Sequence, residues 1–317
     1  MPTTLPLARY RFTFRMVEPL RLPEYAGSLL RGQFGAALRK LACMTGEPDC
    51  SACPLLATCP YPAIFETPAP EHHAMQRFSK VPNPYVIEPP AFGERLIDRG
   101  EALQFSMVLI GHAAAQLPLV SLALQRALEG GLGRERSRGR LEAIEMQDGA
   151  AGQTTFIPLW QHGDARIAAH AATLALPESG GIDSITLQLR TPLRLQQQGR
   201  PIRPEALSPR KLLADLLRRA SLLFEFHAGE TRLVRDVSEL VREAEALRQR
   251  SALHWQDWSR FSSRQQREMT LGGVLGEWTL EGDLSRLFPW LWLGQWLHVG
   301  KNATMGMGRY EIQTPCQ

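Results

Sequence analysis

Two hydrophobic patterns organise the first half of the chain. Polar and bulky side chains alternate strictly over residues 8–15, and this period of two is typical of a half-buried β-strand. Over residues 25–42 apolar side chains recur at spacings of three and four, which predicts an amphipathic helix. The same patterns predict the other elements of this half: strands at 103–110 and 141–146, a helix at 117–128, and an extended, proline-rich connection at 60–90. Their order is roughly β-α-β-β-α-β, with the third strand the least clearly marked.

The second half repeats this order of elements. The patterns predict strands at 185–190, 253–261, 269–280 and 309–313, and helices at 208–226, 237–248 and 284–296. The sequence therefore predicts an α+β protein with two tandem ferredoxin-like (RRM-like) domains. We expect three segments: an N-terminal domain at 1–148 with an inserted four-cysteine loop at 43–59, a linker or edge segment at 149–181, and a C-terminal domain at 182–317.

Each half places a glycine-rich, basic loop just before its last strand. The cations are Arg134, Arg136, Arg138 and Arg140 in loop 131–140, and Lys301, with Arg309 directly after it, in loop 300–308. Glycines allow backbone N–H groups to approach a phosphate closely, and neither loop matches a nucleotide-binding fingerprint. A tight turn alone would explain the glycines but not the basic residues. We therefore expect both loops, including Asn302, to contact a phosphate backbone.

The composition narrows the class of protein. The 317 residues are 44% hydrophobic and 21% charged, which excludes a disordered, collagen-like or coiled-coil chain. No apolar run reaches the roughly 18 residues that cross a bilayer, and the N-terminus has no apolar signal core. We expect a cytoplasmic protein with no membrane contact.

Most of the basic residues are arginines. The net charge is only +4, but 4 of the 36 basic residues are lysines, so 36 − 4 leaves 32 arginines. Arginine favours bidentate phosphate contacts and stacking on bases. A GC-rich genome, which encodes basic residues mainly as arginine, explains the same bias.

Four cysteines form the pattern C-x6-C-x2-C-x5-C: Cys43, Cys50, Cys53 and Cys59. Four thiolates suit tetrahedral zinc, and a C-x2-C pair sits on one tight turn. We expect a structural zinc ion, because four protein ligands leave no open position for catalysis. A [4Fe–4S] cluster uses the same ligand set, and unconnected thiols, or disulfides formed during purification, are further alternatives.

The closing motif LGQWLHVGKNATMGMGRY at 293–310 resembles the C-terminal signature of the CRISPR-associated RAMP endoribonucleases that process precursor crRNA. The run LRGQFGAALRK at 30–40, and Cys59-Pro60-Tyr61 with Ile64-Phe65-Glu66, are similar to a cysteine-containing branch of that family. The resemblance covers both ends of the chain and both glycine loops, but little of 149–206.

The resemblance implies two ferredoxin-like domains that recognise the repeat of a CRISPR transcript. Such enzymes cut without a metal: the 2′-hydroxyl attacks the adjacent phosphate and leaves a 2′,3′-cyclic phosphate and a 5′-hydroxyl. The implied partners are CRISPR repeat RNA, the mature crRNA and other subunits of the CRISPR effector complex.

This chemistry requires a base, an acid and a cation at the phosphate. Histidine suits proton transfer near neutral pH. The catalytic candidates are His298, His72, His73, Lys301 and Tyr25. Further RNA-binding candidates are Arg31, Arg39 and Lys40 on the first helix, and Trp255 and Trp258, which could stack on bases.

One departure from the family pattern leaves a second function open. Members of the family commonly carry a histidine in or near the first helix, and residues 25–42 contain none. The alternative is a non-catalytic subunit that binds crRNA within the effector complex. A metal-dependent nuclease or redox protein ranks lower, because no acidic metal-binding motif accompanies the cysteines.

Overall fold

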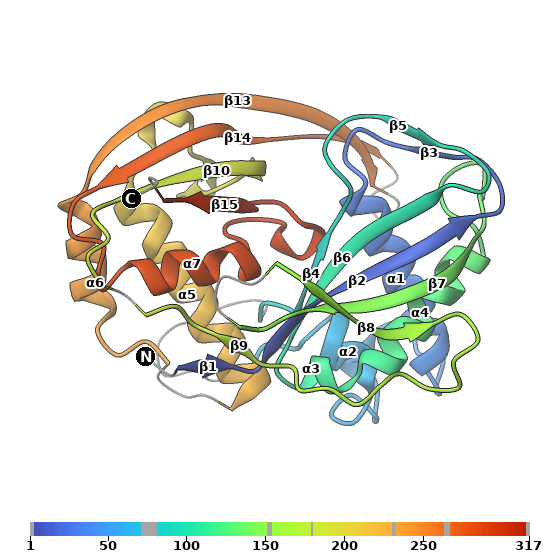
Figure 1. Cartoon of the computed structure of the whole chain (residues 1–317). Coiled ribbons are helices and arrows are strands. Elements are labelled where there is room, and N and C mark those ends of the chain that lie inside the picture. Colours follow the sequence, from blue (N-terminus) through green and yellow to red (C-terminus); the bar gives the residue numbers. More distant parts are fainter. Residues whose placement is uncertain are drawn as a thin grey trace.

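The computed structural model describes residues 3–70, 81–150, 154–178, 180–229, 233–262 and 267–314. Figure 1 shows two sheet-and-helix units side by side, joined by segments that cross between them. No helix in these ranges is long and apolar enough to cross a membrane.

The N-terminal unit is a five-stranded sheet with two helices on one face. Its strands are β2 (Leu7–Met16), β4 (Tyr85–Glu88), β6 (Ala102–Ile110), β7 (Gly139–Gln147) and β8 (Phe156–Gln161), and its main helices are α1 (Gly27–Ala42) and α4 (Leu117–Glu129). Tyr10, Phe12 and Phe14 point from β2 into one core with Phe34 of α1 and Leu124 of α4. The alternation predicted for residues 8–15 is confirmed, with the arginines on the opposite face.

The order of strands in this sheet is β4-β6-β2-β7-β8. Strand β2 pairs antiparallel with both β6 and β7. Counted as first to fourth strand of a β-α-β-β-α-β unit, β2, β4, β6 and β7 lie in the order second-third-first-fourth. That arrangement is ferredoxin-like, and the sequence prediction for the first half is confirmed.

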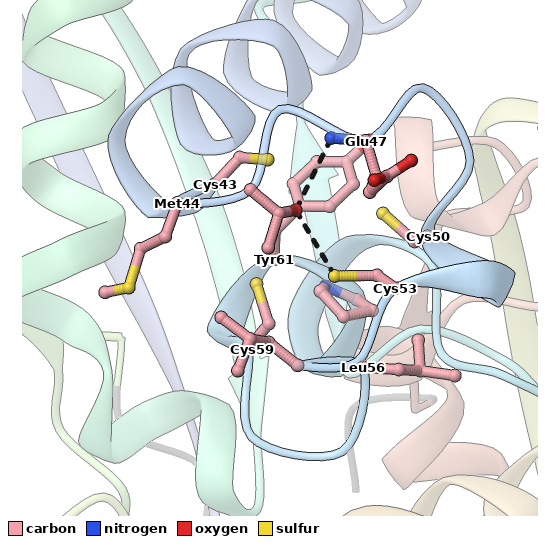
Figure 2. A pocket seen from close by; sticks show the side chains of 11 residues that line it. Cys43, Met44, Glu47, Cys50, Cys53, Leu56, Cys59 and Tyr61 are labelled. Carbon is pink, nitrogen blue, oxygen red and sulfur yellow. Dashed lines mark hydrogen bonds between the residues drawn. The ribbon is translucent and has the colours of Figure 1, made fainter.

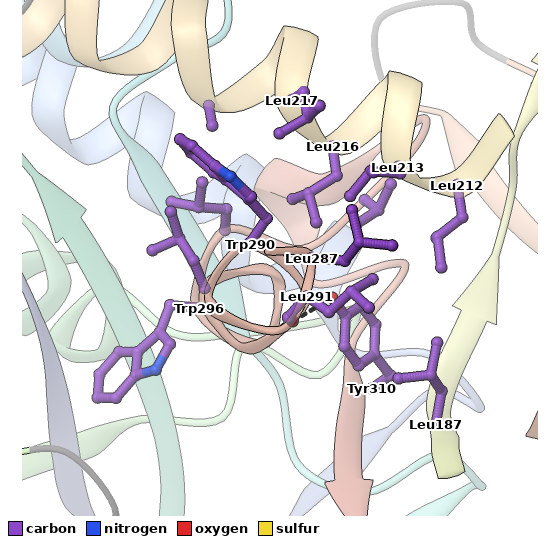
Figure 3. Close-up of a cluster of buried hydrophobic side chains, with 14 of the residues drawn as sticks. Leu187, Leu212, Leu213, Leu216, Leu217, Leu287, Trp290, Leu291, Trp296 and Tyr310 are labelled. Carbon is purple, nitrogen blue, oxygen red and sulfur yellow. Dashed lines mark hydrogen bonds between the residues drawn. The ribbon is translucent and has the colours of Figure 1, made fainter. Parts of the chain in front are cut away.

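The C-terminal unit has the same topology. Its strands are β10 (Ser184–Leu193), β13 (Arg248–Ser262), β14 (Arg267–Glu281) and β15 (Tyr310–Gln313), and its helices are α5 (Pro209–Ala228), α6 (Val237–Glu245) and α7 (Phe288–Leu297). The strand order β13-β14-β10-β15 is again second-third-first-fourth. In Figure 3 Trp290 of α7 lies on the side of the helix that faces Leu216 and Leu217 of α5, and Leu291 lies beside Tyr310, while Trp296 lies on another side of α7, away from α5.

The proline-rich connection departs from the prediction. We expected residues 60–90 to be extended, but Pro60–Phe65 form helix α2. Its prolines lie in the first helical turn, where a missing N–H leaves no hydrogen bond unmade. Residues 85–88 are strand β4, the second strand of the unit, which the sequence analysis left within the extended connection. Helix α6 ends at Glu245 rather than 248, because Arg248 already pairs with Glu281 in the β13–β14 hairpin.

Smaller elements complete the fold. They are β1 (Thr4–Leu5), β3 (Leu20–Leu22), β5 (Arg95–Ile97), β9 (Leu174–Ala175), β11 (Gln196–Gln197), β12 (Arg200–Pro201), α3 (His112–Ala115) and the 3-10 turns η1 (Cys50–Ala52), η2 (Pro204–Ala206) and η3 (Ala303–Met305). Within 149–181, β8 extends the N-terminal sheet and β9 pairs with β1.

The long β13–β14 hairpin reaches across to the N-terminal unit (Figure 1). Near its tip Trp258 is only 3% exposed and packs on Tyr25, with ring centroids 5.5 Å apart, and on Phe92. Met305 and Met307 of the glycine-rich loop join the same small core. The hairpin, the loop and the start of α1 therefore meet at one place.

Candidate nucleic-acid interface

The C-terminal glycine-rich loop is held tightly against its surroundings. The Lys301 N–H donates to the Arg194 carbonyl at 2.9 Å. Gly300 has a φ of +88°, and a Cβ there would lie 2.5 Å from the same carbonyl oxygen. Gly306, with a φ of +93°, comes equally close to the Ile87 carbonyl of β4. Glycine is required at both positions by the positive φ and the close approach, and the Lys301 side chain stays exposed.

The first turn of α1 touches this loop. A Cβ at Gly27 would lie 1.9 Å from the Met305 carbonyl oxygen, and the Tyr25 hydroxyl donates to that oxygen at 2.7 Å. Tyr25 is 5% exposed, and burial raises its pKa well above the usual value. Tyr25 is therefore a neutral hydrogen-bond donor that fixes the loop, and its hydroxyl is not free to act as a base.

His298 follows α7 directly and is completely buried. Its Nε2 lies 3.1 Å from Glu88 Oε1, and its Nδ1 lies 3.1 Å from the Gly306 carbonyl oxygen. Burial lowers the pKa of His298, against the opposing effect of Glu88. Each of the two acceptors also has a second donor: Arg9 for Glu88, and the Thr191 hydroxyl for Gly306. The geometry makes His298 an anchor of the loop.

The ion pair of Arg9 and Glu88 lies where the two units meet. Arg9 on β2 contacts Glu88 at 2.8 Å, donates to the Gln295 carbonyl at 2.8 Å, and stacks 4.1 Å over the Trp296 ring. Burial alone would raise the pKa of Glu88, but the charge of Arg9 and the hydrogen bond from His298 hold it well below its usual range. The carboxylate stays charged and ties the N-terminal sheet to α7 and the glycine-rich loop.

A groove of about 600 Å³ opens beside this pair. Three cations line it, and each has an acidic partner: Arg9 with Glu88, Arg11 with Glu145 at 2.7 Å, and Arg309 with Glu311 at 3.1 Å. Their charge is largely compensated, so this groove attracts phosphate only weakly.

A second surface beside the loop has less compensated charge. Arg203 lies 3.9 Å over the ring of half-exposed Trp255, and Trp255 donates to Asp257 at 2.7 Å. Gly272 lies against Trp255, and its carbonyl accepts from Arg194 at 2.6 Å. Because Arg194 also binds the Lys301 backbone, the four residues Arg194, Arg203, Trp255 and Lys301 are contiguous; we call them the Trp255 strip.

The Trp255 strip combines the features that single-stranded RNA binding uses. In the part of the chain that the structure describes, Lys301 and Arg203 form no salt bridge with a carboxylate. An aromatic face next to free cations suits a stacked base and its phosphate. The sequence singled out Trp255 and Lys301 but missed Arg203 and Arg194. These two arginines stand 52 and 61 positions before Trp255 in the chain (255 − 203 and 255 − 194), so their proximity to it appears only after folding.

Two family models cover the two units. The model described as the AF_1859_N N-terminal domain matches residues 5–172. The model for the CRISPR-associated endoribonuclease Cas6 matches residues 187–310, a range that holds the glycine-rich loop and the Trp255 strip. Residues 187–310, the C-terminal unit, therefore match the Cas6 family. No curated protein sequence matches it at a significant level.

Solved Cas6 structures share the fold. A chain of a partial Cas6-RT-Cas1–Cas2 complex is 14% identical over all of this chain, with a TM-score of 0.57. A Cas6 (TTHB231) product complex is 16% identical over 97% of this chain and 99% of its own, with a TM-score of 0.55. The structure of Thermus thermophilus Cas6 (TTHB231) matches at 15% identity and a TM-score of 0.51, over 99% of this chain and 100% of its own. This chain spans 47% and 30% of the two matched Cas6-RT-Cas1–Cas2 chains.

The first glycine-rich loop, residues 131–140, uses most of its cations internally. Arg138 forms an ion pair with Glu18, Arg140 lies 3.6 Å from Glu142, and Arg136 donates to the Gly130 carbonyl at 2.8 Å. Arg134 is exposed. The two loops are therefore alike in sequence and different in the cations that they leave available.

The cations of α1 have different environments. Arg31 stacks 4.6 Å over Phe65, and Arg39 donates to the Pro48 carbonyl at 2.8 Å, which holds the cysteine loop. Lys40 is exposed and Asn302 is half-buried in a left-handed conformation.

Trp258, a predicted stacking residue, packs in the core with Tyr25 and presents no free face to a base. His72 and His73 lie outside the described residues.

The four cysteines gather beyond the far end of α1. Cys43, Cys50, Cys53 and Cys59 are free thiols that line one small cavity, and Figure 2 shows them on different sides of one space. The backbone N–H of Gly46 is the main cause that lowers the pKa of Cys43. In their present rotamers no three ligating side chains among the described residues are close enough together to hold a metal ion.

Proposed function

We propose that this protein is an endoribonuclease that cuts the repeat of a CRISPR transcript, and that the Trp255 strip and the C-terminal glycine-rich loop bind the RNA. The observation that carries this proposal is the position of exposed Lys301 on a tight loop of the Cas6-matched region. Its backbone N–H donates to Arg194, whose side chain contacts Gly272 against Trp255. The rigid loop would hold a phosphate in place without ordering a flexible segment.

The proposed reaction needs no metal. The 2′-hydroxyl oxygen bonds to the adjacent phosphorus, a base takes its proton, and the bond from phosphorus to the 5′-oxygen breaks as an acid protonates that oxygen. Lys301 would neutralise the charge that develops on the phosphate. Since His298 and Tyr25 are buried, Lys301 is the catalytic candidate that reaches solvent among the described residues, and His72 and His73 stay candidates for proton transfer.

The test is an RNA cleavage assay with CRISPR repeat RNA from the source genome. We expect cleavage in the presence of EDTA, a 2′,3′-cyclic phosphate on the 5′ fragment, and no cleavage of RNA carrying 2′-deoxyribose at the scissile nucleotide. Cleavage that requires a divalent cation, or that survives the 2′-deoxy substitution, would contradict the mechanism.

A second candidate function is a subunit that binds crRNA without cutting it. The observation that favours it is the complete burial of His298 together with the absence of histidine from α1. Tight repeat binding with no cleavage under any condition would select this function. In both cases we expect the bound crRNA to pass to other CRISPR effector subunits, which copurification from the native host would detect.

The variant Lys301→Ala tests the contribution of the glycine-rich loop separately from that of the rest of the surface. We expect cleavage to fall at least about tenfold, because a lost charge contact at the phosphate costs more than about 1.4 kcal/mol, and the salt slope of RNA binding to fall by about one unit. Lys211→Ala is the matched control, since Lys211 pairs with Asp215 on α5 at 2.6 Å. Equal effects of the two variants, measured by cleavage rate and by binding at several salt concentrations, would remove the loop from the RNA site.

A further inference from the structure

The four cysteines lie at the ends of three structural elements. Cys43 ends α1, Cys50 and Cys53 bracket the turn η1, and Cys59 precedes α2. The Cys53 N–H donates to the Cys50 carbonyl at 3.1 Å, so this pair sits on one tight turn. The positions of all four are set by backbone structure rather than by a loose loop.

Other contacts hold the loop in shape around the cavity. The guanidinium of Arg39 donates to the Glu47 and Pro48 carbonyls, and Asp49 accepts from the Ser51 N–H at 2.9 Å. The Thr45 hydroxyl lies 3.4 Å from the Cys53 sulfur. The enclosure is therefore built from this chain alone, and its wall carries four thiols.

The size of the cavity distinguishes between possible occupants. Its volume is about 20 Å³, and a space of at least about 10–15 Å³ holds one water-sized sphere. A single ion fits this volume, whereas a cluster of four irons and four sulfides requires the loop to open. Four thiolates at about 2.3 Å satisfy the tetrahedral preference of zinc.

We propose that Cys43, Cys50, Cys53 and Cys59 bind one Zn²⁺ ion that joins the end of α1 to the start of α2. The thiols must turn into the cavity, since their present rotamers do not bring three of them within reach of one ion. Binding converts them to thiolates and releases their protons to solvent. The zinc closes a 17-residue loop, Cys43 to Cys59, next to the Phe34–Phe65 contact that packs α1 on α2.

The expected role is structural. The opposite end of α1 carries Gly27 against the glycine-rich loop, so the ion lies at the far end of the helix and stabilises its packing. We expect zinc loss to lower the unfolding temperature, while metal-free protein that remains folded keeps its RNA contacts. This proposal stands independently of the RNA-cleaving activity.

The test measures metal in the full-length protein purified under reducing conditions, with inductively coupled plasma mass spectrometry. We expect about one zinc per chain in the wild type and in the control C316S, and less than one-tenth of that in the double variant C50S/C53S. Cys59→His should retain zinc, because imidazole also ligates it. If C50S/C53S fails to fold, cobalt reconstitution of the wild type supplies the second readout: a thiolate-to-cobalt charge-transfer band and tetrahedral d–d bands.

Each other outcome overturns the proposal. Iron with acid-labile sulfide would show a cluster in place of a single ion. A mass deficit that reduction reverses would show disulfides. Four freely titrating thiols without metal, together with no tetrahedral cobalt spectrum, would show that the cavity binds no ion.

Discussion

His227 is a buried histidine at the contact between the two units. It lies on α5, and its Nε2 donates to the Pro82 carbonyl at 2.7 Å. Its ring centroid lies 5.1 Å from that of His112. Burial is the main cause that lowers the pKa of His227 to about 4, and the nearby charges of His112 and Arg219 add to it. Folding therefore selects the neutral form of this side chain.

This shift predicts a dependence of stability on pH. The unfolded histidine titrates near 6.5, so between pH 6.5 and about 4 the unfolded chain binds the proton more readily. The contribution of His227 is complete above pH 6.5 and is lost as the pH falls toward 4, by up to roughly 3 kcal/mol. Urea unfolding between pH 4 and 8 measures it. His227→Gln should flatten the curve, whereas His162→Gln, at an exposed histidine, should not; identical curves for both variants would contradict the assignment.

Trp255 offers the second test at the scale of single residues. Its ring is half-exposed and carries Arg203 on one side. Trp255→Ala should weaken RNA binding by about 1–3 kcal/mol, the range for one stacked base. Trp255→Phe keeps an aromatic face but loses the hydrogen bond to Asp257, and it should retain most of the affinity. Fluorescence anisotropy with labelled repeat RNA distinguishes them, and an equal loss in both variants would show that stacking contributes nothing.

At the scale of elements, the first turn of α1 packs closely against the glycine-rich loop. Gly27 meets the Met305 carbonyl, whereas Gly32, on the same helix, has no atom within 4 Å of an added Cβ. Gly27→Ala should lower the free energy of unfolding by about 1–3 kcal/mol, because backbone must move to admit the methyl group, and it should weaken RNA binding. Gly32→Ala should raise that free energy by about 0.5–1 kcal/mol through helix propensity. Equal stability of the two variants would disprove the close contact; chemical denaturation measures both.

At the scale of the whole molecule, the Arg9–Glu88 pair joins the two units. Glu88 is 3% exposed and also contacts His298. Glu88→Gln leaves the Arg9 charge buried without a carboxylate, so we expect a loss of about 3 kcal/mol in the free energy of unfolding. Glu311→Gln removes an exposed partner of Arg190 and Arg309 and should cost less than about 1 kcal/mol. Comparable losses in urea unfolding would mean that the inter-unit pair is no stronger than a surface pair.

The sequence by itself determined the order of the main elements and the topology class. Alternation over residues 8–15 and the three-and-four spacing over residues 25–42 are local patterns, set by which face of a strand or helix must be buried. The repeated order in both halves was therefore visible without coordinates. Helix α2 and strand β4 were not visible, because α2 is short and starts with prolines, and β4 is buried on both faces and shows no alternation.

Only the tertiary structure decided which of the candidate residues reach the surface. His298 and Lys301 are three positions apart in one motif, yet the first is completely buried and the second is exposed. His298 is buried against Glu88, which forms an ion pair with Arg9, and both of these residues belong to the other half of the chain. Burial and charge compensation arise from contacts between distant segments, whereas residue type and spacing are local properties. A sequence can therefore name the chemistry of a site before the fold decides which side chains perform it.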